Sequence, residues 1–260
     1  NSESIDLANA GILHNVSYDL ATRTFQVTHQ YLDDKPTGDS DDVFTATVTV
    51  IDDDGGDVKD SASVTIANLA PTITGIAASQ TVIDENGQIT VSGSIEDAGS
   101  LDTFTVDINW GDGTTSAATV NSALRTFTAE HVYADDNPTA TASDSYTITA
   151  TATDDDTGTG SMSTTVLVNN VAPVLNNLSF AMDIVEDGIA TLVGQIDDVG
   201  ALDTFTLLID WGDPLSPGNS ESIDLANAGI LHNVSYDLAT RTFQVTHQYL
   251  DDKPTGDSDD

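Results

Sequence analysis

The sequence contains no cysteine, only six lysine and arginine residues, and no hydrophobic run long enough to cross a bilayer. Without cysteine the chain can form no disulfide, no thiolate metal site and no thiol nucleophile. A membrane-spanning helix needs about 20 apolar residues, so we predict no membrane insertion by this segment. With 43 acidic residues and a net charge of −37, the surface repels phosphate. This charge excludes nucleic acids and anionic membranes as partners.

Aromatic residues are scarce too, at 6%, and charged residues make up only 19% of the chain. High net charge by itself favours disorder. However, 38% of the residues are hydrophobic, and Val, Ile, Thr, Phe and Tyr recur throughout, which is typical of β-strands. The sequence therefore predicts a folded all-β protein, whose 260 residues suffice for about two domains.

An identical internal repeat organises the chain. Residues 1–42 and 219–260 are the same 42 letters, so the repeat period is 218 residues. The repeated piece carries eight acids and two bases, and subtracting its −6 from −37 leaves −31 for one period. Carboxylates in such excess either keep a protein soluble in high salt or bind cations, chiefly calcium.

A weaker repeat divides the period into two domains. GSIEDAGSLDTFTVDINWG (93–111) resembles GQIDDVGALDTFTLLIDWG (194–212) at an offset of 101 residues. The flanking segments NLAP (68–71) and NVAP (170–173) match as well. Their prolines remove a backbone donor and stiffen these short linkers, which favours a rod over flexibly joined domains.

We predict three units from these repeats. Residues 1–68 are the C-terminal part of a B-type repeat, residues 69–170 are a complete domain A, and residues 171–260 are a domain B that lacks its last strands. The closing strands that domain B lacks are expected to correspond to residues 43–68, at the front of the chain. The chain is therefore expected to be a piece of a long tandem array.

Apolar and polar residues alternate along many segments, with the period of two that predicts antiparallel β-sandwiches. The alternating positions are Phe104, Val106, Ile108 and Trp110; Phe127, Ala129, His131 and Tyr133; Tyr146, Ile148, Ala150 and Ala152; Phe205, Leu207, Ile209 and Trp211; Phe25, Val27, His29 and Tyr31; and Phe44, Ala46, Val48 and Val50. Turn signals such as Asn86-Gly87 separate these strands.

Three motifs in domain A resemble the PKD-type repeat of bacterial surface proteins. They are WGDGT (110–114), HVY (131–133) and YTITATATD (146–154), in the order of the family's W/F-G-D-G turn, H-x-Y strand and Y-T-V-T-L-T-V-x-D strand. Domain B departs from this pattern, because WGD (211–213) is followed by Pro214 and a longer insert. The resemblance implies tandem immunoglobulin-like sandwiches, an extracellular or cell-surface location, and a structural or adhesive role without catalysis.

Acidic residues recur at matched loop positions in both domains and are candidate metal ligands. In domain A with its linker they are Asn68, Glu85, Glu96, Asp97, Asp102, Asp154, Asp155 and Asp156. The matching B set is Asn170, Glu186, Asp197, Asp198, Asp203, Asp52, Asp53 and Asp54. Calcium takes six to eight oxygen ligands, so we expect Ca²⁺ here. The alternative is that turns favour Asp and Asn for backbone reasons.

The family resemblance adds to this expectation. Several PKD-like domains bind calcium near the domain start. The Asn-x-Ala-Pro linkers also resemble, more weakly, cadherin-type junctions, in which calcium makes the joint rigid. Ca²⁺ is accordingly the one cofactor that we expect.

Other chemical sites are less favoured. Gly111-Asp112-Gly113 could bind a ligand, but glycine turns with an Asp are more often tight turns. His29, His131 and His247 are better explained as half-buried imidazoles bonded to a neighbouring strand than as catalytic bases. No HExxH, GxSxG or phosphate-binding loop is present in the sequence. Paired carboxylates can hydrolyse glycosides, but the few aromatics are needed in the core. We therefore expect no enzyme activity.

The predicted function is structural. We expect a repeat segment of a giant secreted or cell-surface bacterial protein that forms an extended, calcium-stiffened stalk or fibre for adhesion or matrix assembly. Its expected partners are neighbouring repeats and, through laterally bridged faces, other arrays. Two alternatives are an adhesion module whose B insert, Pro214 to Arg241, recognises a glycan or protein, and an accessory domain of a hydrolase.

Overall fold

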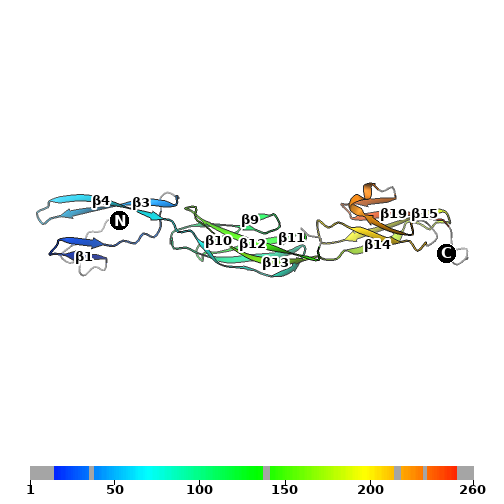
Figure 1. Ribbon diagram of the computed structural model, residues 1–260, viewed down its shortest axis with the longest axis horizontal. Helices are drawn as coiled ribbons and strands as arrows, with labels where there is room; N and C mark the ends of the chain where they lie inside the picture. The colour runs from blue at the N-terminus through cyan, green and yellow to red at the C-terminus, as the bar shows by residue number, and fades with distance from the viewer. Residues whose placement is uncertain (1–14, 35–37, 137–140, 214–217, 231–232, 251–260) are drawn as a thin grey trace.

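The computed structural model of this chain describes residues 15–34, 38–136, 141–213, 218–230 and 233–250. These residues form strands and one 3-10 helix, η2 (Leu225–Ile230). No helix in these ranges has the length and apolarity that crossing a membrane requires. The front segment, domain A and domain B follow one another along a single extended axis (Figure 1).

Domain A is a sandwich of two sheets, with strand orders β10-β11-β7-β5 and β6-β13-β12-β8-β9. The strands are β5 (Thr72–Ala78), β6 (Val82–Asp84), β7 (Gly87–Glu96), β8 (Phe104–Asn109), β9 (Thr115–Ala117), β10 (Thr119–Asn121), β11 (Thr126–Tyr133), β12 (Ser143–Asp154) and β13 (Thr159–Asn169). All neighbours are antiparallel except β6, which pairs with β13 in parallel. The predicted all-β, immunoglobulin-like sandwich is confirmed in this domain.

The core of domain A lies between the two sheets and uses the alternating residues that the sequence predicted. Phe104, Val106, Ile108 and Trp110 are all buried on β8 and just after it. Strand β12 adds Tyr146, Ile148, Ala150 and Ala152 from the same sheet. The polar residues between them face solvent, because successive side chains of a strand point to opposite faces.

The WGDGT turn and the HVY strand form one structural unit. Gly111 and Gly113 have φ angles of +86° and +90°, so the predicted tight turn is confirmed. His131 stacks on Trp110 with ring centroids 4.7 Å apart and donates from Nε2 to Asp112 at 2.6 Å. The imidazole is thus bonded to the turn rather than to a strand. Tyr133 donates its hydroxyl to the Trp110 carbonyl at 2.7 Å, which fixes the start of the turn.

Replacing Tyr133 by Phe is expected to destabilise the protein by about 1–3 kcal/mol, because the buried Trp110 carbonyl loses its donor. The control is Tyr236→Phe in domain B, since the Tyr236 hydroxyl is buried without a partner. Removing that hydroxyl should leave stability unchanged or improve it. Urea unfolding followed by circular dichroism measures both, and equal losses in the two variants would contradict the assignment.

Domain B repeats part of this architecture, with a sheet β14-β15-β19-β18 and a separate pair β16-β17. Its strands are β14 (Val174–Phe180), β15 (Gly188–Asp197), β16 (Thr206–Asp210), β17 (Ser220–Asp224), β18 (Val234–Asp237) and β19 (Thr242–Tyr249). The described part of the B insert supplies β17, η2 and β18. It buries Ile223 and Leu225 beside Trp211, whose indole donates to Glu221 at 3.0 Å. This part of the insert therefore builds the domain's own core.

The front segment consists of two hairpins, β1 (Val16–Asp19) with β2 (Thr24–Val27), and β3 (Asp41–Ile51) with β4 (Asp57–Ala67). The alternation along Phe25–Tyr31 and along Phe44–Val50 predicted buried residues, and most of those positions are exposed instead. Val48 is 43% and Val50 is 45% exposed. The reason is tertiary, because within the described residues β3 and β4 pair only with each other and are not part of a larger sheet.

Candidate metal centres at the two joints

Both joints between successive units are built in the same way. At the first, the Ser100 amide donates to the Leu32 carbonyl at 3.0 Å, and at the second the Ala201 amide donates to the Ala134 carbonyl at 3.0 Å. Each accepting residue belongs to a Tyr-x-Asp-Asp sequence (31–34 and 133–136) that follows a strand or extended segment. Each donor lies in the loop that precedes β8 or its B-domain counterpart β16. The chain therefore brings one acidic segment from each side to each joint.

Seven aspartates gather at the first joint. They are Asp33 and Asp34 from the front segment and Asp97, Asp102, Asp154, Asp155 and Asp156 from domain A. Carboxylate oxygens of Asp33, Asp34 and Asp156 lie within 4.8 Å of one another, as do those of Asp102, Asp155 and Asp156, and those of Asp97, Asp102 and Asp154. Since these groups share members, they form one continuous cluster that spans the joint.

Several of these oxygens are buried and have no hydrogen-bond donor. Asp156 is 0% exposed, and neither of its carboxylate oxygens has a hydrogen-bond partner. Asp34 is 3% exposed, and one of its carboxylate oxygens likewise has no partner. Both oxygens of Asp102 also lack a donor. A buried carboxylate without a partner costs several kcal/mol, unless a cation or proton compensates it. Oxygen atoms of this kind are the ligands that hard cations prefer.

The remaining acids of the first joint are held by the chain itself. Asp154 accepts from the amides of Asp156 at 3.1 Å and Gly158 at 2.6 Å, and from the Asn68 side chain at 2.9 Å. Asp155 accepts from the Thr103 amide at 2.8 Å. These bonds fix the loop after β12 so that it presents Asp156 toward the front segment.

The second joint repeats the cluster with four carboxylates within 4.8 Å of one another. They are Glu85, Asp135 and Asp136 from domain A and Asp203 from domain B. Glu85 is 3% and Asp136 is 4% exposed, and each has one oxygen without a donor. The other oxygen of Glu85 accepts from the Val171 amide in the linker at 2.7 Å. Asp135 accepts from the Leu202 amide at 2.7 Å, which ties domain A directly to the loop of domain B.

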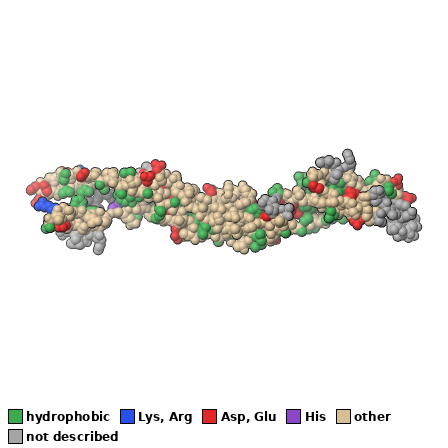
Figure 2. All heavy atoms as spheres, in the orientation of Figure 1, with side chains coloured by type: hydrophobic (Ala, Val, Ile, Leu, Met, Phe, Trp, Pro, Cys, Tyr) green, Lys and Arg blue, Asp and Glu red, His purple; other side chains and the backbone are tan. Residues whose placement is uncertain are grey.

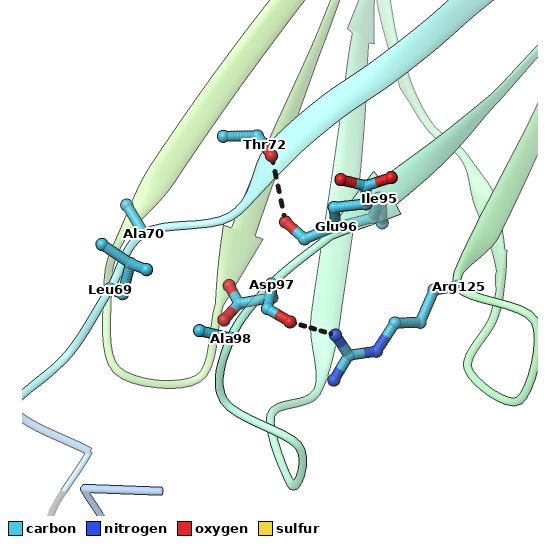
Figure 3. A pocket seen from close by; sticks show the side chains of 8 residues that line it. All are labelled: Leu69, Ala70, Thr72, Ile95, Glu96, Asp97, Ala98 and Arg125. Carbon is cyan, nitrogen blue, oxygen red and sulfur yellow. Dashed lines mark hydrogen bonds between the residues drawn. The ribbon is translucent and has the colours of Figure 1, made fainter. Parts of the chain in front are cut away.

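An arginine shapes the acidic loop on the domain side of each joint. Arg125 donates to the carbonyls of Asp97 at 2.8 Å and Gly99 at 2.6 Å, beside a shallow groove that also includes Leu69 (Figure 3). Arg241 makes the equivalent bonds to Asp198 and Gly200, at 2.8 and 2.7 Å. Because both guanidinium groups bind carbonyls, they order the loops and leave the carboxylates to other partners.

Burial and mutual repulsion raise the pKa of several of these carboxyl groups. The pKa of Asp102 rises to about 7 through burial and the nearby charge of Asp97. That of Asp156 rises to about 6 through burial and Asp34, and that of Asp203 to about 6 through burial and Glu85. Glu85 itself is shifted upward in pKa by burial, despite its bond from Val171. The clusters thus hold more negative charge than their surroundings stabilise.

The pH dependence of stability in chelator follows from these shifts. The raised pKa values of about 7 for Asp102 and about 6 for Asp156 and Asp203 mean that folding disfavours their charged forms. This penalty is complete above pH 7 and is relieved as the pH falls toward the ordinary value of 3.8. We expect the melting temperature in chelator to rise as the pH is lowered from 8 to about 5. A melting temperature that falls steadily as the pH is lowered over this range would contradict the assignment.

The structure brings some of the predicted ligands together and separates others. Asp97, Asp102, Asp154 and Asp156 come together as predicted. Glu85 does not lie with them, because β6 and the turn after it place it at the opposite end of the sandwich, beside Asp203. Asp198 lies in the loop next to Asp203, where its side chain accepts from the Gly200 amide at 2.9 Å.

Other predicted ligands lie away from both clusters. Glu96 and Asp197 are exposed, as is Glu186 in domain B. Asp52, Asp53 and Asp54 occupy the exposed turn between β3 and β4, where Asp52 accepts from the amides of Asp54 and Gly56. The Asn170 amide donates to the Ala142 carbonyl in domain A, which makes it part of the linker structure.

The sequence interpretation missed the acids on the preceding side of each joint. They are Asp33 and Asp34, and Asp135 and Asp136. A signal for them exists, because Tyr-x-Asp-Asp occurs three times, at 31–34, 133–136 and 249–252, each time two residues after a histidine. The third occurrence extends beyond the described residues.

Acidic side chains occur at several places along the visible face of the rod, and basic ones only near its front end (Figure 2). The packed antiparallel sheets define the fold class of this chain as all-β, with immunoglobulin-like sandwich architecture.

Comparisons with known proteins find only distant structural likenesses. No protein-family model matches the sequence, and no curated relative matches it. Among solved structures the chain is similar to the PKD domain of an M14-like peptidase from Thermoplasmatales archaeon SCGC AB-540-F20, with 20% identity and a TM-score of 0.30, over 40% of this chain and 97% of that one. It is also similar to Dpr2 Ig1-Ig2 in complex with DIP-Theta Ig1-Ig3, with 12% identity and a TM-score of 0.26, over 70% and 88%. These likenesses concern the fold alone.

Proposed function

We propose that this chain is a repeat segment of an extracellular stalk or fibre, and that Ca²⁺ bound at each joint holds successive sandwiches in line. The observation that carries the proposal is the set of buried carboxylate oxygens without donors, contributed from both sides of each joint. The donor set is all oxygen, which suits a hard cation such as calcium rather than a transition metal.

Electrostatics supports a cation that acts as a bridge. Asp34 and Asp156 belong to different units but approach each other within one cluster, so without a cation they repel. A divalent ion between them turns this repulsion into attraction and opposes bending or separation of the joint. Asp136 and Asp203 stand in the same relation across the second joint. Calcium is therefore expected to change the flexibility of the rod more than the fold of its domains.

Small-angle X-ray scattering tests this proposal. In millimolar calcium the chain should scatter as a rigid rod, whereas in chelator it should show a broader and shorter distribution of interatomic distances. Asp102→Asn with Asp203→Asn, one substitution at each joint, should behave in calcium as the unaltered chain does in chelator. A control substitution, Asp107→Asn on the exposed face of β8, should change nothing. Scattering that is identical with and without calcium would contradict the proposal.

A further inference from the structure

The acidic segments of the two joints differ in the aromatic ring that packs against them. Tyr-Leu-Asp-Asp (31–34) supplies the first joint and Tyr-Ala-Asp-Asp (133–136) supplies the second, at an offset of 102 residues. The same offset takes Phe44 on β3 to Tyr146 on β12. The packed ring therefore carries a hydroxyl at the second joint and none at the first.

The two rings occupy equivalent places. The ring of Tyr146 lies 4.8 Å from that of Tyr133, centroid to centroid, and the ring of Phe44 lies 4.9 Å from that of Tyr31. Each contact thus brings a ring of the following strand against the tyrosine that opens the acidic segment. What distinguishes the two contacts chemically is the hydroxyl group of Tyr146.

This hydroxyl binds the backbone of the acidic pair at the second joint. It donates to the Asp135 carbonyl at 3.3 Å, in a buried setting where Tyr146 is 4% and Asp135 is 7% exposed. Burial and the charge of Asp144 raise the pKa of Tyr146 to about 12, so the hydroxyl keeps its proton at neutral pH. The hydroxyl is therefore available as a donor under the conditions in which carboxylates bind cations.

The Asp135 carbonyl belongs to the peptide that joins two candidate ligands, Asp135 and Asp136. Fixing this peptide limits the directions in which both side chains leave the backbone. Domain B fixes the same segment from the other side of the joint. The Ala201 amide donates to the Ala134 carbonyl at 3.0 Å, and the Leu202 amide donates to the Asp135 side chain at 2.7 Å. A ligand set that is ordered beforehand loses less conformational entropy when the cation binds.

We propose that Tyr146 is a positioning residue for the cation site at the second joint, which it orders through the Asp135 carbonyl. This role presupposes the calcium site proposed above, whose affinity the hydroxyl raises. Phe44 has no hydroxyl and cannot donate to the Asp33 carbonyl, so the first joint lacks this bond. One oxygen atom on a core ring thereby tunes the calcium concentration at which a joint becomes rigid, without any change of ligand.

Calorimetric titration with calcium isolates the second joint in a chain that carries Asp156→Asn, because the first joint has then lost a central ligand. In this background Tyr146→Phe should weaken calcium binding about three- to tenfold, which is the range for one hydrogen bond. Tyr133→Phe is the matched control, since its hydroxyl donates to the Trp110 carbonyl instead. Both substitutions should lower the melting temperature in chelator, but only Tyr146→Phe should change the dissociation constant for calcium.

The reverse substitution tests the first joint. In a chain that carries Asp203→Asn, which removes a ligand of the second joint, Phe44→Tyr should tighten calcium binding by a similar factor. This variant keeps the role testable if Tyr146→Phe folds poorly, because it adds a hydroxyl and removes nothing.

The outcomes separate the positioning role from the calcium site itself. An affinity that neither Tyr146→Phe nor Phe44→Tyr changes would overturn the positioning role alone. Equal weakening by Tyr146→Phe and Tyr133→Phe would also overturn it, because the effect would then follow from lost stability. If the unaltered chain binds no calcium at all, the proposed function fails, and the positioning role fails with it.

Discussion

Calcium at millimolar concentration is expected to raise the melting temperature of the chain by several degrees relative to chelator. Ligand present at 100 times its dissociation constant adds about 2.7 kcal/mol per site to the folded state, and each of the two joints offers a cluster. Differential scanning calorimetry in calcium and in chelator measures the shift. Magnesium should produce a smaller one, because it demands near-octahedral geometry and dehydrates reluctantly.

Substitutions within a joint make this expectation specific. Asp156→Asn removes a ligand, so it should lower the melting temperature in calcium. In chelator the same substitution should raise it, because the carboxylate is buried beside Asp34 without a donor and its pKa is raised to about 6. The control Asp107→Asn, on an exposed strand position, should have little effect in either buffer. The same sign of effect for Asp156→Asn in both buffers would rule out a cation at the first joint.

Trp110→Ala is expected to have the largest effect of any single substitution in domain A. The side chain is 0% exposed, stacks on His131 and donates to Ser116 at 2.9 Å. Replacing a buried Trp by Ala costs about 3–5 kcal/mol, which is a large part of the ordinary stability of a domain. Domain A should therefore unfold at a much lower urea concentration than in the unaltered chain.

The two tryptophans make the result assignable to a domain. The sequence has only two, Trp110 in domain A and Trp211 in domain B, so in the Trp110→Ala variant the remaining fluorescence reports domain B alone. Circular dichroism should show an early transition that Trp211 fluorescence does not follow. Coincident transitions by both probes would mean that the joint couples the two domains strongly, and an unshifted first transition would contradict the assigned core.

The strands were predictable because their cause is local. The alternation Phe104-x-Val106-x-Ile108 specifies a half-buried strand wherever a second sheet covers it, and domain A supplies that sheet. The same alternation at Val48 and Val50 predicted burial, and they are exposed. The alternation along a strand predicts which of its faces is apolar, but whether that face is buried depends on the elements that pack against it.

The ligand clusters were predictable only in part. Repeat matching placed Asp102 and Asp203 at equivalent positions, which the structure bears out, since each lies at a joint. It could not show at which end of a sandwich a residue lies, and so Glu85 was grouped with Asp102 although it contributes to the next joint. Asp136 was missed because the alternation in β11 ends before it, and only the joint itself shows that the following unit meets this segment.

The most direct test of a calcium-bridged joint is a crystal structure of this chain grown in calcium, with anomalous diffraction to locate the ions. The account predicts ions at both joints, each bound by carboxylates from the two flanking units, including Asp34 with Asp156 and Asp136 with Asp203, at oxygen distances of about 2.3–2.6 Å. Joints that are ordered at saturating calcium with no ion among these carboxylates, or with ions ligated from one unit only, would contradict it.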